Sequence, residues 1–147
     1  MKKLSCIVLI FVLLSLSPVS GKAAEKDVIH FEDGSYMTIE IITDGTKASG
    51  TVTGSKKSTY YGSDGGSEWV AVLTGRYTYT GSDASCISSD LNVNIQDSDW
   101  YVVTQSATKS GNTAYGSATM GLRVTGVTIR TVPVSLTLSC DGNGNLS

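Results

Sequence analysis

The chain has 147 residues, of which 16% are charged, with a formal net charge of −2 and a sequence pI near 5.2. Because an acidic chain without a basic stripe cannot displace counterions from phosphates, we expect no nucleic acid partner. The length suits one domain with a core of its own and is too short for two.

The first 23 residues predict a secretory signal peptide. Two lysines precede an apolar run over residues 6–14, and small residues stand just before Ala24, where cleavage is expected. The run is shorter than the roughly 20 apolar residues of a membrane-spanning helix, so we expect no stable membrane anchor after cleavage. A single secreted domain is therefore expected at residues 24–147, with 8 basic and 13 acidic residues and a net charge of −5.

Beyond residue 24, apolar and polar side chains alternate, which is typical of β-strands, and no window has helical spacing. The expected strands are a short edge strand at 28–31, then 36–42, 51–61, 68–80, a strand that follows the turn at Gly81 and ends at 95, and strands at 100–109, 113–124 and 127–140. Seven to nine strands at hairpin spacing predict an all-β fold, an antiparallel β-sandwich or alternatively a small barrel.

Two of these strands carry signals of a sheet edge. The strand at 51–61 is weakly apolar, contains Gly54 and carries Lys56 and Lys57, so we interpret it as an edge strand protected from unwanted pairing. In the last strand, Pro133 lies on the row opposite the apolar stripe. Because proline has no N–H to donate, this position argues for an edge or a bulge.

Cys86 and Cys140 are the cysteines that remain after the signal peptide is removed, and in an oxidising compartment we expect them to form one disulfide. Cys140 shares a row with the apolar stripe of the last strand, whereas Cys86 has the opposite parity to Leu91. Both sulfurs can meet in the core only if the earlier strand shifts by one residue. We therefore predict a β-bulge near Ser88-Ser89.

Several segments carry a resemblance to a family. They are FEDGSY at 31–36, Trp69, Thr74-Gly75, YTYTGS at 77–82, Cys86, ATKSGNTA at 107–114, LTLSC at 136–140 and GNLS at 144–147. In these segments the chain resembles an uncharacterised family of small secreted β-rich proteins from Gram-positive anaerobic bacteria. The resemblance covers nearly all of the mature chain and implies no catalytic residues.

The sequence offers little equipment for catalysis or for metal binding. His30 has no partner evident in the sequence, and acids such as Asp97 and Asp99 fall in turns, where carboxylates accept local backbone hydrogen bonds. Residues 141–145 space oxygen-bearing side chains like the start of a calcium loop, but the sequence has no closing glutamate, so we favour a frayed polar tail. We expect no enzyme, no metal and no cofactor.

A binding function is the hypothesis that the sequence favours. Tyr77, Tyr79, Tyr101 and Tyr115 are tentative ligand-binding residues, on an open face that stacks on a cell-surface glycan or contacts a protein. The alternative is that these tyrosines only stabilise cross-strand pairs. A second hypothesis is a secreted toxin or bacteriocin-like membrane-active protein, with residues 113–124 as the segment closest to a membrane strand.

Overall fold

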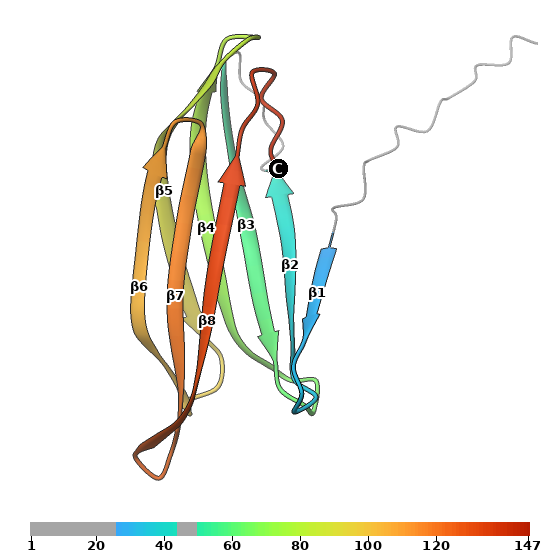
Figure 1. Cartoon of the computed structure of the whole chain (residues 1–147), viewed down its shortest axis with the longest axis vertical. Coiled ribbons are helices and arrows are strands. Elements are labelled where there is room, and N and C mark those ends of the chain that lie inside the picture. The colour runs from blue at the N-terminus through green and yellow to red at the C-terminus, as the bar shows by residue number, and fades with distance from the viewer. Residues whose placement is uncertain (1–25, 44–49) are drawn as a thin grey trace, which may run out of the picture.

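The computed structural model describes residues 26–43 and 50–147, and this part of the chain forms eight antiparallel β-strands and no helix (Figure 1). The strands are β1 (Lys26–His30), β2 (Tyr36–Thr43), β3 (Thr51–Tyr61), β4 (Ser67–Tyr79), β5 (Ala84–Ile95), β6 (Trp100–Ser110), β7 (Thr113–Val124) and β8 (Val127–Ser139). The predicted signal peptide at 1–23 lies outside the described residues. Within them, no helix is long and apolar enough to cross a membrane.

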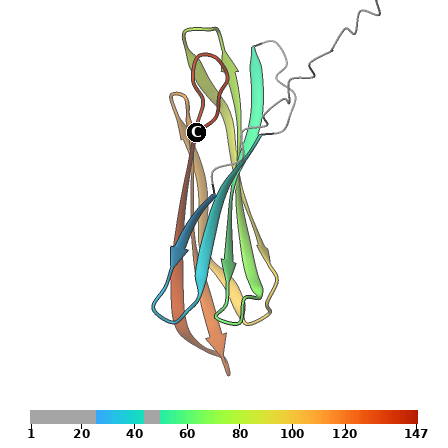
Figure 2. The same ribbon diagram turned by 90° about the vertical axis from the view of Figure 1, so that its right-hand side faces the viewer.

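Consecutive strands pair as hairpins within two sheets. One sheet has the order β1-β2-β3-β4-β5 and the other the order β6-β7-β8. The chain passes from the first sheet to the second after β5, and the two sheets form separate layers when the molecule is turned by 90° (Figure 2). The sequence allowed a sandwich or a small barrel. Because both sheets end in edge strands, the structure is a sandwich.

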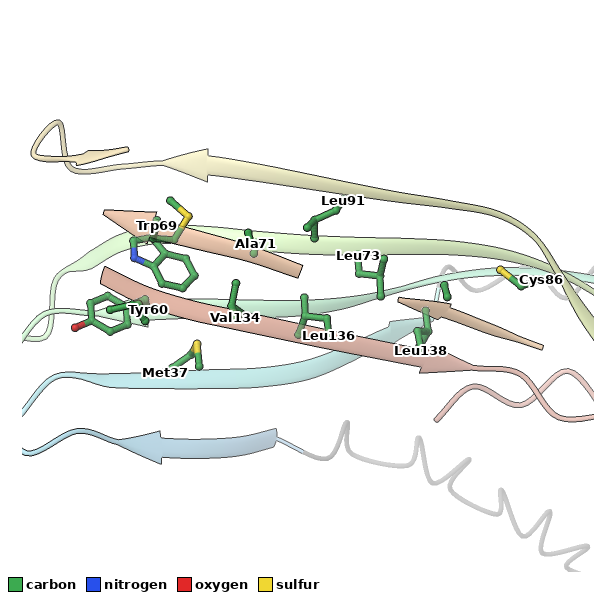
Figure 3. Packing of buried hydrophobic residues seen from close by; sticks show 14 of the residues in the cluster. Met37, Tyr60, Trp69, Ala71, Leu73, Cys86, Leu91, Val134, Leu136 and Leu138 are labelled. Atoms are coloured by element: carbon green, nitrogen blue, oxygen red, sulfur yellow. The ribbon is translucent and has the colours of Figure 1, made fainter. Parts of the chain in front are cut away.

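Alternate residues of both sheets point between the layers and form the core (Figure 3). Its fully buried members include Val52, Tyr60, Trp69, Ala71, Leu73, Tyr77, Ala114, Met120 and Leu138. At one end, the Tyr60 ring stacks on Trp69 with centroids 5.2 Å apart and meets Trp100 at the same distance, edge to face. The Tyr60 hydroxyl donates to Ser35 Oγ at 2.8 Å, so the polar atom of this buried ring is satisfied.

The interpretation of residues 51–61 as an edge strand is wrong, because β3 is an interior strand paired with both β2 and β4. Gly54 lies on the inner face of β3, where the Leu146 side chain takes the place that a Cβ would fill. Lys57 forms an ion pair with Glu40 of β2, with 2.6 Å between nitrogen and oxygen. The apolar pattern of β3 is weak because the side chain of Leu146, far along the sequence, fills the space above Gly54.

The bulge predicted near Ser88-Ser89 is confirmed, one residue earlier than expected. Arg76 pairs with Ser88 and Tyr77 pairs with Cys86, so that Ile87 is the extra residue of β5. This shift turns Cys86 into the core, where it is 5% exposed, while Leu91 stays on the same inner face. The edge signal of Pro133 is confirmed as well, since β8 is the outer strand of its sheet.

The expected disulfide is not present in the structure. Cys86 Sγ donates to the Ser88 carbonyl and Cys140 Sγ to the Asp141 carbonyl, each at 3.3 Å. The turn between β6 and β7 is hydrogen-bonded to both cysteines, because the Cys86 N–H donates to Gly111 O and the Cys140 N–H to Asn112 O. Both side chains are buried in one region, yet each sulfur is turned to its own neighbouring backbone.

Residues 141–147 are folded back onto the sandwich, so the expectation of a frayed tail is wrong. Asp141 Oδ1 accepts the N–H groups of Asn143 and Asn145, and Asp141 Oδ2 accepts Asn145 Nδ2, all within 2.9 Å. The carboxylate is thus used to hold a turn. Leu146 then pairs with Cys140 on the open edge of β8.

Candidate functional site

Tyr77 is a core residue and lies away from any open face. Its side chain is fully buried, and its hydroxyl donates to the Leu138 carbonyl at 2.6 Å, which joins the larger sheet to the smaller one. Burial raises the pKa of Tyr77. Its ring lies over Gly75, where a Cβ would come within 2.7 Å of three ring and hydroxyl atoms.

Tyr79 and Tyr101 pack against glycines of neighbouring segments. A Cβ at Gly144 would come 2.7 Å from the Tyr79 ring, and one at Gly121 would come 2.6 Å from the Tyr101 ring. The Arg123 guanidinium covers the Tyr101 ring, 4.4 Å from its centroid. A hydrogen bond with Thr128 lowers the pKa of Tyr101. Other residues of the chain therefore cover part of both tyrosine rings.

Tyr115 is the one member of the four that projects from an open sheet surface, with 43% of its area exposed. It stands on the outer face of β7, between Thr108 of β6 and Thr137 of β8, which are its cross-strand partners. The structure therefore does not gather the four tyrosines on one face, and Tyr115 is the candidate that stays accessible.

The surface around Tyr115, which we call the hydroxyl face, carries short hydroxyl side chains and no charge. It consists of the outward-facing residues Thr104, Ser106, Thr108, Tyr115, Ser117, Thr119, Pro133, Ser135 and Thr137. Ser117 lies opposite Ser106 and Ser135, and the Ser106 and Ser117 hydroxyls are 3.0 Å apart. Because each hydroxyl both donates and accepts, the face can pair with donors and acceptors of either kind.

A shallow pocket of about 200 Å³ lies on this face, beside Tyr115. Its lining residues are Ser106, Thr108, Tyr115, Gly116, Ser117, Ser135, Leu136 and Thr137. The lining thus combines one aromatic ring with hydroxyl groups and contains no ionisable carboxyl, amine or imidazole group. It suits a small neutral ligand that presents both an apolar face and hydroxyl groups.

Acidic residues and the histidine lie elsewhere. Asp97 Oδ1 accepts the Asp99 N–H at 2.8 Å within the turn before β6, which confirms the expected role of the Asp97 carboxylate. His30 is exposed at the end of β1, with its ring 5.9 Å from that of Tyr36. Among the described residues, no three His, Cys, Asp or Glu side chains form a group that could hold a metal ion.

The hydroxyl residues around Tyr115 were missed by reasoning on tyrosines alone. A usable signal exists, because residues 104–108, 115–119 and 133–137 each place Ser, Thr, Tyr or Pro at every second position. A second row was missed as well: Tyr36 and Tyr61 stack with ring centroids 4.6 Å apart on the outer face of the larger sheet. Their ring faces are turned toward each other, which leaves less ring surface for a ligand than at Tyr115.

The sequence matches no protein-family model, and no curated protein matches it. Among solved structures, the chain is similar to a hypothetical protein from Listeria monocytogenes EGD-e, with a TM-score of 0.48 and 18% sequence identity. That similarity covers 84% of this chain and 91% of the other. At this level it says nothing about function.

Proposed function

We propose that this protein is a secreted binding module that recognises a neutral glycan on the hydroxyl face and catalyses no reaction. The observation that carries the proposal is an exposed tyrosine, Tyr115, in an uncharged pocket lined by serine and threonine hydroxyls. The C–H face of a sugar ring packs on an aromatic ring, while its hydroxyls exchange hydrogen bonds with neighbouring serines and threonines. A charged ligand finds no counter-charge there.

Secretion belongs to the proposal and rests on the sequence pattern of residues 1–23. The lack of a disulfide does not oppose it, because the two cysteines are 5% and 1% exposed and a buried thiol is slow to oxidise. Burial also raises the pKa of Cys86, which keeps the reactive thiolate rare. A protein with two such thiols can persist outside the cell without a disulfide.

The test is a glycan array probed with the labelled protein, compared across variants of one position. We expect Tyr115→Ala to weaken binding to the best array ligand about fivefold, because ring stacking is worth about 1 kcal/mol. Tyr115→Phe keeps the ring and should bind within about twofold of the wild type. Tyr36→Ala is the matched control, because Tyr36 lies on the outer face of the larger sheet, away from the hydroxyl face. Equal binding by Tyr115→Ala and wild type would contradict the proposal.

A membrane-active protein is the second candidate, and the tip of the β7–β8 hairpin favours it. Val127 and Ile129 are 62% and 61% exposed, and Val124 lies opposite Val127 next to the turn. The hairpin projects beyond the rest of the sandwich (Figure 1). By contrast, the apolar row of residues 113–124 faces the core through Ala114, Ala118 and Met120, so it is not a lipid-facing row.

Dye release from lipid vesicles separates the two candidates. A membrane-active protein should release dye, and Ile129→Asp should abolish the release because a charge at the tip opposes entry into lipid. Ile87→Asp is the matched control, because Ile87 is an exposed isoleucine of β5 near the turn at 111–112, at the other end of the sandwich from the tip. Glycan binding without release supports the binding module instead.

A further inference from the structure

The two sheets differ in width, and the narrower one leaves part of the wider one uncovered. The smaller sheet has three strands, and its edge strand β8 packs over β3 and β4, whereas the larger sheet continues to β2 and β1. Ile29 of β1 is 42% exposed on the inner face, and Ile39 and Ile41 of β2 are half-buried beside it. An apolar strip therefore lies next to the edge of β8.

The strip ends in a pocket of about 200 Å³ close to Ser147. The pocket is lined by Asp27, Ile39, Glu40, Ile41, Lys56 and Ser147. Glu40 is paired with Lys57. On the inner face, Asp27 lies opposite Ile39 and Lys56 lies opposite Ile41, so one charge of each sign flanks the isoleucines. The pocket therefore has no strong preference for one sign of charge.

Backbone groups of β8 point toward this strip. Ser139 donates its N–H to Ser147 O at 2.9 Å and accepts the Ser147 N–H at 3.0 Å, so its backbone faces away from β7. Because the direction alternates along a strand, Thr137 and Ser135 also direct N–H and C=O outward. Pro133 has the same parity, which explains why β8 accepts a residue without an N–H there.

Leu146 and Ser147 already occupy the start of a strand position beside β8. They run antiparallel to it, and Leu146 packs its side chain on Gly54 of the inner face. At the far end, Arg130 lies 5.5 Å from the Phe31 ring and pairs with Asp33. The strip between these two ends, with the outward backbone of Ser135 and Thr137 and the isoleucines of β1 and β2, is the β8 edge site.

We propose that the β8 edge site binds an extended segment of a partner protein, which adds as a strand antiparallel to β8. An added strand can satisfy both features of this site. Its backbone pairs with the outward N–H and C=O groups of β8, and its alternate side chains cover the isoleucines. The segment continues the pairing that Ser147 begins. Its inward side chains are apolar and uncharged, at every second position.

The probe is a fluorescein-labelled peptide of seven residues that alternates threonine and valine, measured by fluorescence polarisation against the full chain. We expect saturable binding, and none for the same peptide with proline at its centre, which removes a backbone donor. Ile29→Glu should weaken the binding at least about tenfold, because it places a charge on the strip. Val28→Glu is the matched control, since Val28 is 48% exposed on the opposite face of the same strand.

A second pair of variants tests the backbone of β8. Ser135→Pro removes an outward N–H without breaking the pairing with β7, as Pro133 does naturally, and should weaken the peptide at least about tenfold. Ser135→Ala keeps the N–H and should bind within about twofold of the wild type. Circular dichroism checks that each variant keeps its β-sheet spectrum.

Three results would overturn the proposal. One is the lack of saturable binding by the threonine–valine peptide. Another is an equal loss of binding in Ile29→Glu and Val28→Glu. The third is a wild-type dimer in sedimentation that Ile29→Glu converts to a monomer, because the occupant of the strip would then be a second copy of this chain.

Discussion

The close contact between Gly75 and Tyr77 on the inner face of β4 makes a sharp test of the core. The Tyr77 ring folds back along its own strand over Gly75, and its hydroxyl reaches the Leu138 carbonyl of the opposite sheet. In Gly75→Ala, the new Cβ would lie 2.3 Å from the Tyr77 hydroxyl oxygen and 2.6 Å from Cζ. The substitution must therefore displace the ring.

The magnitude follows from three contributions. Overpacking a core costs about 1–3 kcal/mol, and the lost hydrogen bond leaves buried polar atoms that cost about 1 kcal/mol more. Alanine stabilises a strand by about 0.5–1 kcal/mol relative to glycine, because it restricts the unfolded chain. We expect Gly75→Ala to lower the free energy of unfolding by about 2–3 kcal/mol.

Urea unfolding followed by tryptophan fluorescence measures this loss, since Trp69 and Trp100 are both buried. With an m value of about 1.5 kcal/mol per M, the urea midpoint should fall by about 1.5 M. Gly116→Ala is the control, because its Cβ would meet the terminal methyl groups of Leu73 and Leu91 at 3.1 Å, which can move. It should cost less than about 1 kcal/mol.

A double-mutant cycle with Tyr77→Phe isolates the hydrogen bond. Alone, Tyr77→Phe should cost about 1–2 kcal/mol, because the Leu138 carbonyl loses a buried donor. If alanine at position 75 already breaks this bond, Tyr77→Phe should cost almost nothing in that background, which gives a coupling of about 1 kcal/mol. Strictly additive losses, or a Gly75→Ala variant as stable as wild type, would refute the geometry described for Tyr77.

Three further predictions concern buried polar and ionisable groups. In the chain that begins at Ala24, Ellman's reagent should titrate two thiols in denaturant and almost none in the folded protein, because Cys86 and Cys140 are buried and no disulfide joins them; a single mass peak two hydrogens lighter would show a disulfide instead. Burial raises the pKa of Glu68 above its usual value of 4.5. The folded protein therefore binds this proton more tightly than the unfolded chain does. The stability that protonation provides is lost as pH rises through the folded pKa. Glu68→Gln should therefore raise the urea midpoint at neutral pH, with no gain near pH 4. Ser58→Ala should leave stability unchanged or raise it by up to about 1 kcal/mol, because the Ser58 hydroxyl is buried without a hydrogen-bond partner in the described part of the chain; a loss above that amount in urea unfolding would reveal a partner.

Local features of the fold could be predicted from the sequence because they depend on neighbours along the chain. The period of two placed the strands, and Gly, Asn and Asp marked the turns, as at Asp97. The bulge predicted near Ser88-Ser89, and found at Ile87, followed from parity together with the expectation that Cys86 lies in the core with Cys140. Pro133 indicated an edge because its missing N–H cannot serve an interior strand.

The tertiary structure decided what depends on segments far apart in the sequence. Gly54 suggested an edge strand, but Leu146 fills the space above it and β3 lies in the interior. Parity predicts that Cys86 and Cys140 both face the core, but it does not predict whether their sulfurs meet. The turn at 111–112 is hydrogen-bonded to both cysteines, and its position cannot be predicted from the sequence of either strand. Likewise, the packing of one sheet on the other buries Tyr77 and leaves Tyr115 open. Alternation assigns each side chain to a face of its sheet, whereas the choice of which face is covered is made by the partner layer.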